Sequence, residues 1–321
     1  MGGPCHGTPL ELGLDNPGLR GLNVPSSHMS ASAKPDKIGV IGGSGVYDIA
    51  GLRDSNWKKV ATPFGEPSDE FLSGVLEDQA IVFLPRHGRG HRIAPHEINH
   101  RANLWAMKSL GVSRLLSISA VGSLQERYRP LDMVLPSQFF DRTKKSAEHT
   151  FFGRGIVAHV SFADPVCREF QLHLYESART IVTEANVHLG GTYVNMEGPA
   201  FSTRAESESY RAMRFDVIGM TNLGEAKLAR ESEMCYSSLS MVTDYDCWKT
   251  GEESVTVEMI IQRLQKNAEN SKKILKTLLA NLPAQAKCDC GSSLKHSILT
   301  PRKQWPEETL AALKPVLRKY A

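Results

Sequence analysis

Short apolar runs recur along this chain from Lys37 onward, and each ends in a glycine, a charged residue or a hydroxyl side chain. The runs are KIGVIGGSG, IVFLPRHGRG, LLSISAVGS, DMVLPSQFFD, TYVNMEGPAFS, DVIGMTN and SSLSMVTDYD. They are continuous rather than alternating, which is typical of strands that are covered on both faces. The sequence therefore predicts an α/β fold of three layers, in which helices flank a central mixed or mostly parallel β-sheet.

Helical patterns lie between the runs. The ranges are about 96–110, 203–214, 223–232 and 256–280, the longest. Thr203 and Glu206 form a capping box at the start of the second range. A stripe of apolar residues along the longest range predicts one buried face. A further helix is expected from Pro306 through Leu310 and Leu313, with a break or kink at Pro315.

The chain divides into three parts by composition. Residues 1–36 are rich in Gly, Pro and Ser and have no periodicity, so we expect a disordered leader or a cloning remnant, with Met29 as the true start. Residues 37–281 form the predicted main domain. Residues 282–321 form a C-terminal extension that contains Cys288-Asp289-Cys290 and a short helix.

Charge and hydropathy exclude several classes of protein. The chain has 38 Lys and Arg against 35 Asp and Glu, a net charge of +3, so no surface for a nucleic-acid polyanion is expected. No apolar stretch approaches the roughly 20 residues of a membrane helix, and there is no signal peptide pattern. We therefore expect a cytoplasmic protein that binds neither nucleic acid nor membrane.

The six cysteines, at positions 5, 167, 235, 247, 288 and 290, are too sparse for a secreted disulfide framework. Only Cys288 and Cys290 form a cluster. Two ligands without a second pair are weak support for zinc, and no HExxH or CxxC…CxxC pattern occurs. Two thiols in a surface loop, a local disulfide and a thiol-exchange motif all stay open for this pair.

Polar signatures gather at the ends of the predicted strands, where α/β sheets bind ligands. Gly42-Gly43-Ser44-Gly45 is a glycine-rich turn in which backbone N–H groups and the Ser44 hydroxyl can approach an anion. Arg86 and His87 follow another strand, and a guanidinium can grip phosphate through two oxygens. A tight structural turn and a solvated basic loop are the respective alternatives.

Three further strand ends offer weaker signals. Ser119 lies in a turn of small residues, without the GxSxG pattern of an α/β hydrolase. Phe201 precedes a helix, where its ring can stack on a flat ligand, although a core aromatic residue is the competing interpretation. Met220 and Thr221 can contact a sugar and a phosphate oxygen, although methionine is usually a core residue.

The stretch Thr243-Asp244-Tyr245-Asp246-Cys247-Trp248 places two carboxylates at the end of a buried run. Burying a carboxylate is costly unless a ligand binds it or its pKa rises. The pair is therefore a candidate for ligand binding, and the alternative is that it caps a helix or pairs with an arginine.

These motifs, taken in order, resemble the trimeric purine nucleoside phosphorylase superfamily, and within it the branch that cleaves 5′-methylthioadenosine. The matching segments are GGSG, PFGEPSD, RHGRGH, NHRANLWA, SAVGSL, EGPAFSTRAES, GMTNLGEAKLARE and VTDYDCWK. The resemblance covers about residues 37–280 and leaves out 1–36 and 282–321.

The resemblance implies a reaction and a set of site residues. Inorganic phosphate attacks C1′ of the ribose, and adenine leaves with 5-methylthioribose 1-phosphate as the second product. The implied phosphate-binding residues are Ser44, Arg86, His87, Ser119, Ala120 through its backbone amide, and Thr221. By the same resemblance, Met220 lies under the ribose, Phe201 packs against the base, Asp244 acts as general acid at the purine N7, and Asp246 helps to hold the amino group.

The resemblance also implies an apolar pocket for the 5′ thioether and a site shared between subunits. Val257, Ile260 and Ile261 match the family's pocket on the long helix, and His159 matches a residue that reaches the site of a neighbouring subunit. Spacing alone would make these a core stripe and a solvated histidine. A homotrimer acting on a nucleoside and phosphate, with no metal or organic cofactor, is the implied assembly.

Two departures and two rival functions stay open. Ala200 and Asn222-Leu223-Gly224 differ from the pattern of many relatives near the pocket mouth, which puts substrate breadth in doubt. The first rival is a broader purine nucleoside phosphorylase that accepts adenosine, inosine or guanosine. The second is a non-catalytic NAD-binding module, which the imperfect GxGxxG pattern disfavours. The Cys288 and Cys290 tail resembles that of some heat-stable relatives, and a redox-labile clip there is a hypothesis.

Overall fold

The computed structural model describes residues 36–43, 46, 48–249 and 257–321, and these residues form one eleven-stranded sheet with helices. The strands are β1 (Lys37–Gly42), β2 (Arg53–Lys58), β3 (Phe71–Leu76), β4 (Gln79–Pro85), β5 (Val112–Ser123), β6 (Met133–Leu135), β7 (Gln138–Asp141), β8 (Val187–Leu189), β9 (Thr192–Asn195), β10 (Val217–Gly219) and β11 (Cys235–Asp244). The α-helices are α1 (His100–Ser109), α2 (Arg168–Ile181), α3 (Arg204–Ala212), α4 (Asn222–Glu231), α5 (Val257–Asn281), α6 (Glu307–Ala312) and α7 (Lys314–Leu317).

Strand β5 is the centre of the sheet because three strands pair with it. β1 and β11 run parallel to β5, and β10 runs antiparallel to it. The main path is β2-β3-β4-β1-β5-β10-β9-β7, while β11 pairs with β5 on its other edge and continues to β6 and β8. Both kinds of pairing are present, so the predicted mixed sheet is confirmed.

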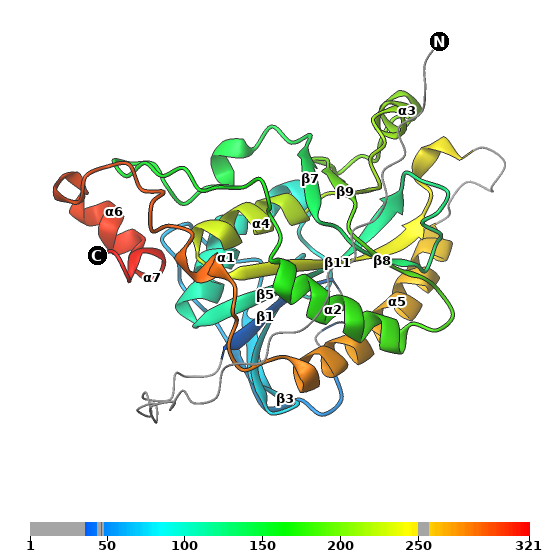
Figure 1. The fold of residues 1–321 in the computed structure, drawn as a ribbon, viewed down its shortest axis with the longest axis horizontal. Coiled ribbons are helices and arrows are strands. Elements are labelled where there is room, and N and C mark those ends of the chain that lie inside the picture. Colours follow the sequence, from blue (N-terminus) through cyan, green and yellow to red (C-terminus); the bar gives the residue numbers. More distant parts are fainter. Residues whose placement is uncertain (1–35, 44–45, 47, 250–256) are drawn as a thin grey trace, which may run out of the picture. The chain divides into compact units, whose positions relative to one another are not determined.

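Successive strand residues enter two separate cores, which makes the fold three-layered. In β4, Ile81 and Phe83 pack in the core that α2 and α5 cover, whereas Val82 and Leu84 pack in the core that α1 and α4 cover. Figure 1 shows these two pairs of helices on opposite sides of the strands. The continuous apolar runs arise because both faces of each strand are buried.

The predicted helices are found close to their expected ranges. Residues Pro95–Glu97 form a separate 3₁₀ turn, so α1 begins at His100 rather than near residue 96. The Thr203 and Glu206 capping box at the start of α3 is confirmed. Near the C-terminus, α6 ends at Ala312 and α7 begins at Lys314, which agrees with the predicted break at Pro315.

Several elements were not predicted, and the burial of their side chains explains why. Gln171 and Ser177 interrupt the buried face of α2, so no clean apolar stripe marks this helix. Strand β2 has the sequence RDSNWK and is almost wholly exposed. The run DMVLPSQFFD was predicted as one strand, but it is split into β6 and β7 around Pro136, which cannot donate a ladder hydrogen bond.

The C-terminal extension packs on the domain rather than standing apart from it. Leu294, Leu313 and Leu317 are buried in the core beside α1, and the Trp105 indole donates to Ala312 O at 2.7 Å. Asp36, the last residue of the predicted leader, forms an ion pair with Arg114 at 2.8 Å. None of the described helices combines the length and apolar character needed to cross a membrane.

Substitution of Leu275 tests the buried face of α5. Leu275 is fully buried between α5 and the sheet, so Leu275→Ala should lower the free energy of unfolding by about 2–5 kcal/mol because it leaves a cavity. Lys273→Ala, on the exposed side of the same helix, is the control and should change it by less than about 0.5 kcal/mol. Urea denaturation measures both, and equal effects would contradict the assigned helix orientation.

Candidate active site

The edge of β5 that faces β1 and β10 has a gap in its strand pairing. β1 pairs with β5 as far as Ser117, and β10 pairs only with Gly122 and Ser123. Between these points no strand of the described chain pairs with residues 118–121 on this edge, while β11 pairs with all of them on the other. The gap is roughly 13 Å long, at about 3.3 Å per residue. It opens where β1 ends, the position at which α/β sheets bind ligands.

The backbone of β5 points an amide into this gap. The Ile118 carbonyl accepts a hydrogen bond from Arg86 Nη1 at 2.8 Å on the gap side. The N–H and C=O of one strand residue point to the same edge, and alternate residues repeat that direction, so the Ala120 N–H also points into the gap. Ala120 is exposed although Ser119 and Val121 on either side are buried. The centre of the sheet is therefore accessible at Ala120.

Arg86 closes one end of the gap through an ion pair with Glu225. Arg86 Nε donates to Glu225 Oε1 at 2.6 Å and Nη2 to Oε2 at 3.2 Å. Nη2 also donates to Ser117 Oγ at 2.8 Å and to Ile41 O at 3.2 Å. One guanidinium thereby connects the ends of β1 and β4, the middle of β5 and the first turns of α4.

This ion pair is almost completely buried, and its energetics follow from that. The two side chains are 2% and 1% exposed. Burial on its own would lower the pKa of Arg86, but the negative charge of Glu225 outweighs this effect and raises it. The guanidinium stays charged, and Glu225 balances that charge. Either partner alone would be an uncompensated buried charge.

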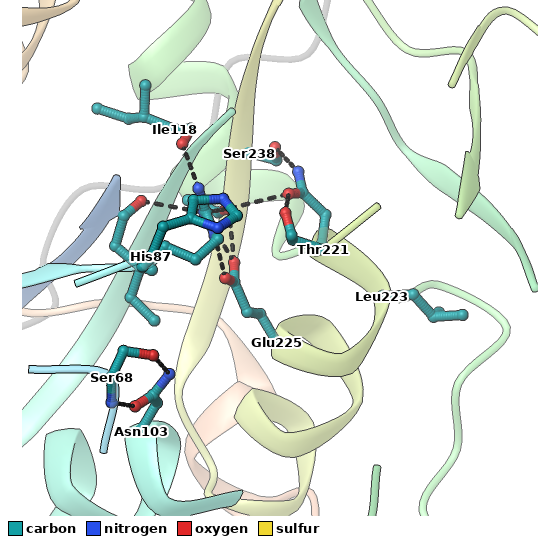
Figure 2. Close-up of polar contacts among 12 residues, drawn as sticks. Ser68, His87, Asn103, Ile118, Thr221, Leu223, Glu225 and Ser238 are labelled. Atoms are coloured by element: carbon teal, nitrogen blue, oxygen red, sulfur yellow. Dashed lines mark hydrogen bonds and ion pairs between the residues drawn. The ribbon is translucent and has the colours of Figure 1, made fainter. Parts of the chain in front are cut away.

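Hydrogen bonds connect the first turns of α4 to the neighbouring strands, as Figure 2 shows. Ser117 Oγ donates to Glu225 Oε2 at 2.6 Å. Thr221 Oγ1 donates to Asn222 Oδ1 at 3.2 Å, and Asn222 Nδ2 donates to the Ser238 hydroxyl. These bonds tie the N-terminal end of α4 to both β5 and β11.

Two hydroxyl groups and a helix end flank the gap. Thr221 is the N-cap residue of α4, and the N-terminal N–H groups of this helix carry partial positive charge that attracts anions. The Ser119 hydroxyl is buried and has no hydrogen-bond partner among the described residues. With the Ala120 amide, these groups make the gap suited to an anion.

His87 is neutral at pH 7 and has a defined tautomer. Burial lowers the pKa of His87 to about 4, with the charge of Arg86 as the second cause. Its Nδ1 lies 2.9 Å from the Ile93 carbonyl, which can only accept, so Nδ1 carries the proton. Nε2 is therefore an acceptor and can receive a hydrogen bond from a protonated phosphate oxygen.

The carboxylates Asp244 and Asp246 lie beyond the other end of the gap. A register shift at the end of β11 sets Asp244 opposite Gly122 of β5. Its carboxylate accepts from the Thr243 hydroxyl at 2.7 Å and from the Asp246 N–H at 2.8 Å. Burial raises the pKa of Asp246, and the neighbouring Asp244 carboxylate raises it further. Asp246 therefore gives up its proton less readily than a solvent-exposed aspartate would.

Met220 and Phe201 lie at the open side of the site. Met220 is half-buried and packs on Gly198, where a Cβ would lie 2.6 Å from the Met220 sulfur. Phe201 is 75% exposed, which excludes a core aromatic residue and leaves its face free for a ligand. A cavity of about 360 Å³ adjoins Met220 and is lined also by Asn195, Glu197, His96 and His100.

Other predicted residues lie elsewhere or outside the described chain. His159 is exposed, and its N–H donates to Ser297 O of the C-terminal extension at 2.8 Å. Ser44 lies outside the described residues. The backbone of Val257, Ile260 and Ile261 belongs to the first turns of α5, but the placement of their side chains lies outside what the structure describes.

Glu225, Ser117 and Asn222 organise the site, and none was predicted to do so. Glu225 stands in the helical stretch NLGEAKLARE, where a glutamate normally indicates a solvated face. The available signal was its spacing: Glu225 is three residues after Asn222 and next to Ala226, which places both polar side chains on the apolar face of the helix. Ser117 was part of the quoted SISAVGS turn but was given no role.

The arrangement separates two chemical tasks along the gap in β5. The Ala120 amide, two hydroxyls and a helix N-terminus stand at one end, where they stabilise an anion. The two aspartate carboxyls stand beyond the other end. A substrate bound between them can be attacked by an oxyanion on one side and protonated on the other.

Comparison with known proteins gives a consistent result. The sequence profile of the "Phosphorylase superfamily" matches residues 37–280. The S-methyl-5′-thioadenosine phosphorylase of Geobacter sulfurreducens is 50% identical over 283 residues, which cover 88% of this chain and 98% of that protein. The enzyme of the same name from Gloeobacter violaceus is 53% identical over 287 residues, with 88% and 96% covered.

Solved structures agree with the sequence comparisons. A methylthioadenosine phosphorylase from an antarctic soil metagenomic library superposes with a TM-score of 0.84 at 44% identity, covering 89% of this chain and all of that one. A variant of the adenosine/methylthioadenosine phosphorylase from Schistosoma mansoni, in complex with methylthioadenosine, superposes with a TM-score of 0.71 at 38% identity, covering 81% and 96%.

Substitution of Glu225 tests the buried ion pair. Glu225→Gln keeps the size of the side chain but leaves the Arg86 charge unbalanced, so the free energy of unfolding should fall by about 3–5 kcal/mol. The control is Asp78→Asn in the exposed Arg53–Asp78 pair, where the loss should stay below about 1 kcal/mol. Chemical denaturation measures both variants. Similar small losses would mean that Glu225 does not hold Arg86.

Proposed function

The chain belongs to the phosphorylase superfamily, and we propose that it is an S-methyl-5′-thioadenosine phosphorylase, which splits 5′-methylthioadenosine with phosphate into adenine and 5-methylthioribose 1-phosphate. The observation that carries this proposal is the gap along β5, with anion-binding groups at one end and the Asp244–Asp246 pair beyond the other. The relatives at 50% and 53% identity bear the same enzyme name. The reaction is a pentosyl transfer that returns adenine to purine salvage and the sugar phosphate to methionine salvage.

Phosphate binds at the end of the gap nearest Arg86. The Ala120 N–H and the Ser119 hydroxyl donate to its oxygens, and the α4 N-terminus favours its charge. The Thr221 hydroxyl joins them when its hydrogen turns from Asn222 Oδ1 to the phosphate. His87 Nε2 accepts from a protonated oxygen of the same anion. Arg86 is bonded to protein groups and its charge is balanced by Glu225, so we assign it the positioning of β1, β5 and α4 around the phosphate. Ser44 completes the set by resemblance.

The ribose and the base lie further along the gap. Met220 supports the sugar, and Phe201 covers the purine. A phosphate oxygen attacks C1′, and the C1′–N9 bond breaks while its electron pair moves into the purine ring. The sugar is oxocarbenium-like at this point, so the adjacent phosphate anion stabilises it.

The leaving adenine receives its proton at N7. Asp244 faces N7, and Asp246 holds the amino group. The Asp246 N–H donates to the Asp244 carboxylate at 2.8 Å, which fixes the relative position of the two residues. In its protonated form, the Asp244 carboxyl gives its proton to N7 as negative charge develops there.

A broader specificity is the second candidate, because the Schistosoma mansoni enzyme is named for both adenosine and methylthioadenosine. Val257, Ile260 and Ile261, by resemblance, supply the apolar pocket that would favour the thioether over a 5′ hydroxyl. The pair of aspartates suits the 6-amino group of adenine better than the 6-oxo group of inosine or guanosine.

We further propose a homotrimer in which His159 completes the site of a neighbouring subunit. His159 is exposed, and two apolar residues of the same surface, Val157 and Leu299, are 45% and 62% exposed. The Leu299 N–H donates to Val157 O at 2.8 Å, so the two segments of this surface are held together. Phosphate is the co-substrate, the reaction itself needs no metal or organic cofactor, and a cytoplasmic location suits a salvage enzyme.

A substrate comparison tests the proposed function. The purified protein should release adenine from 5′-methylthioadenosine only when phosphate is present, and the rate should exceed that with adenosine, inosine or guanosine. Chromatographic detection of the free base measures all four substrates in one assay. Release of hypoxanthine from inosine at the higher rate would favour the broader enzyme, and no release of any base would contradict both candidates.

Substitution of Asp244 tests its role as general acid. Asp244→Asn should lower kcat with 5′-methylthioadenosine by about 10²-fold or more, the size expected for a lost proton donor. The exposed Asp164→Asn is the control and should retain full activity. Steady-state kinetics with near-ultraviolet detection of adenine measures both. An unchanged kcat would give Asp244 a structural role only.

A further inference from the structure

Four cysteines from distant parts of the chain meet at one point of the fold. Cys167, Cys235, Cys288 and Cys290 each offer one sulfur, and all four Sγ atoms lie within 4.8 Å of one another. Cys288 Sγ is 3.5 Å from Cys167 Sγ and 3.3 Å from Cys235 Sγ. The sequence showed only the Cys288 and Cys290 pair. Because the fold packs these two thiols against Cys167 and Cys235, the interpretation of two thiols in a surface loop was wrong.

The spacing of these sulfurs fits tetrahedral coordination. Zinc–sulfur bonds of about 2.3 Å place the corners of a tetrahedron about 3.8 Å apart. That value falls inside the range of 3.3 to 4.8 Å seen here. All four cysteines are free thiols in the structure.

The fold holds the four sulfurs in place through backbone contacts. Cys167 is the N-cap residue of α2, and its N–H donates to the carbonyl of Tyr236, the neighbour of Cys235, at 2.8 Å. Cys235 is the first residue of β11. Cys288 precedes a 3₁₀ turn that contains Cys290, and the N–H of Lys287 before it donates to the Glu169 carboxylate at 2.9 Å. The ligands are therefore largely pre-organised.

Burial and charge around the cluster suit a metal thiolate. Cys167 and Cys235 are 3% and 4% exposed, whereas Cys288 and Cys290 are half-buried and leave a path by which an ion can enter. Four thiolates and a divalent cation carry a net charge of −2. Arg114 stands opposite Cys235 in the strand register and lines the same small crevice as Cys167 and Cys235, so a cation lies on this side of the cluster.

We propose that Cys167, Cys235, Cys288 and Cys290 form a tetrathiolate site for one zinc ion. Binding converts four thiols into four thiolates and releases four protons to solvent, with no change in oxidation state. All four positions of the metal are taken by protein ligands, as in structural rather than catalytic zinc sites.

The place of the site in the fold also makes it structural. Cys235 and Asp244 are the first and last residues of β11, so along the strand they are roughly 30 Å apart, at about 3.3 Å per residue. The metal joins the C-terminal extension to α2 and to the amino end of β11. Its role is to fix residues 282–321 on the domain, and it takes no part in the chemistry of the gap.

Metal analysis of the full-length chain tests this proposal. Protein expressed with zinc and purified under reducing conditions should contain about one zinc per chain by mass spectrometry of the elements. Four thiols should react with a thiol reagent only after a strong chelator removes the metal. Replacement by Co²⁺ should give the absorption bands of tetrahedral cobalt with sulfur ligands. Less than a tenth of an equivalent of metal, or an intact mass that shows disulfides among these cysteines, would overturn the proposal.

Matched variants and a stability measurement locate the metal. Cys167→Ser and Cys290→Ser should each lose most of the zinc, whereas Cys247→Ser, outside the cluster, should retain it. If the ligand variants fail to fold, removal of the metal from the wild-type protein with a chelator tests the site instead. Chelation should lower Tm by about 5–10 °C, as expected when a chain of this size loses a few kcal/mol of stability, and should leave phosphorolysis at low temperature intact. Zinc retained by the ligand variants would place the metal elsewhere and contradict the assignment.

Discussion

The buried ion pair between Arg86 and Glu225 is the interaction on which the candidate active site depends. Its hydrogen bonds reach β1 through Ile41, β5 through Ser117 and Ile118, and α4 through the glutamate itself. A charged group this deeply buried is stable only with its partner in place, so the end of β4 and the start of α4 have one arrangement relative to each other. Thr221 at the start of α4 and Ala120 on β5 are positioned as a consequence.

That arrangement explains why the site lies in the middle of a sheet. β1 ends early, β10 begins late, and the intervening edge of β5 keeps backbone groups that no described strand pairs with. Arg86 occupies one end of the opening, and the register shift at the end of β11 sets Asp244 opposite Gly122, beyond the other end. The geometry of β5 sets the distance between the anion-binding groups and the aspartates. A loop could not fix this distance as rigidly as a strand does.

The sequence predicted the layers and most of the residues around the gap, because continuous apolar runs and polar strand ends are local signals. Ser119, Ala120 and Thr221 lie around the gap in β5, and Asp244 lies beyond its far end. The sequence did not predict that Glu225 is buried, because a glutamate on a helix is expected to face solvent unless a buried partner is known. Cys167 and Cys235 could not be joined to Cys288, since 121 and 53 residues separate them and only the fold brings them together.

A crystal structure of the protein with inorganic phosphate and adenine tests the central claim most directly. The phosphate should lie against the Ala120 N–H, between the hydroxyls of Ser119 and Thr221, with the purine N7 facing Asp244. The separation between the two ligands should run along the gap in β5. A phosphate bound away from Ala120, or an adenine seated in the cavity of His96 and His100 instead, would contradict the account.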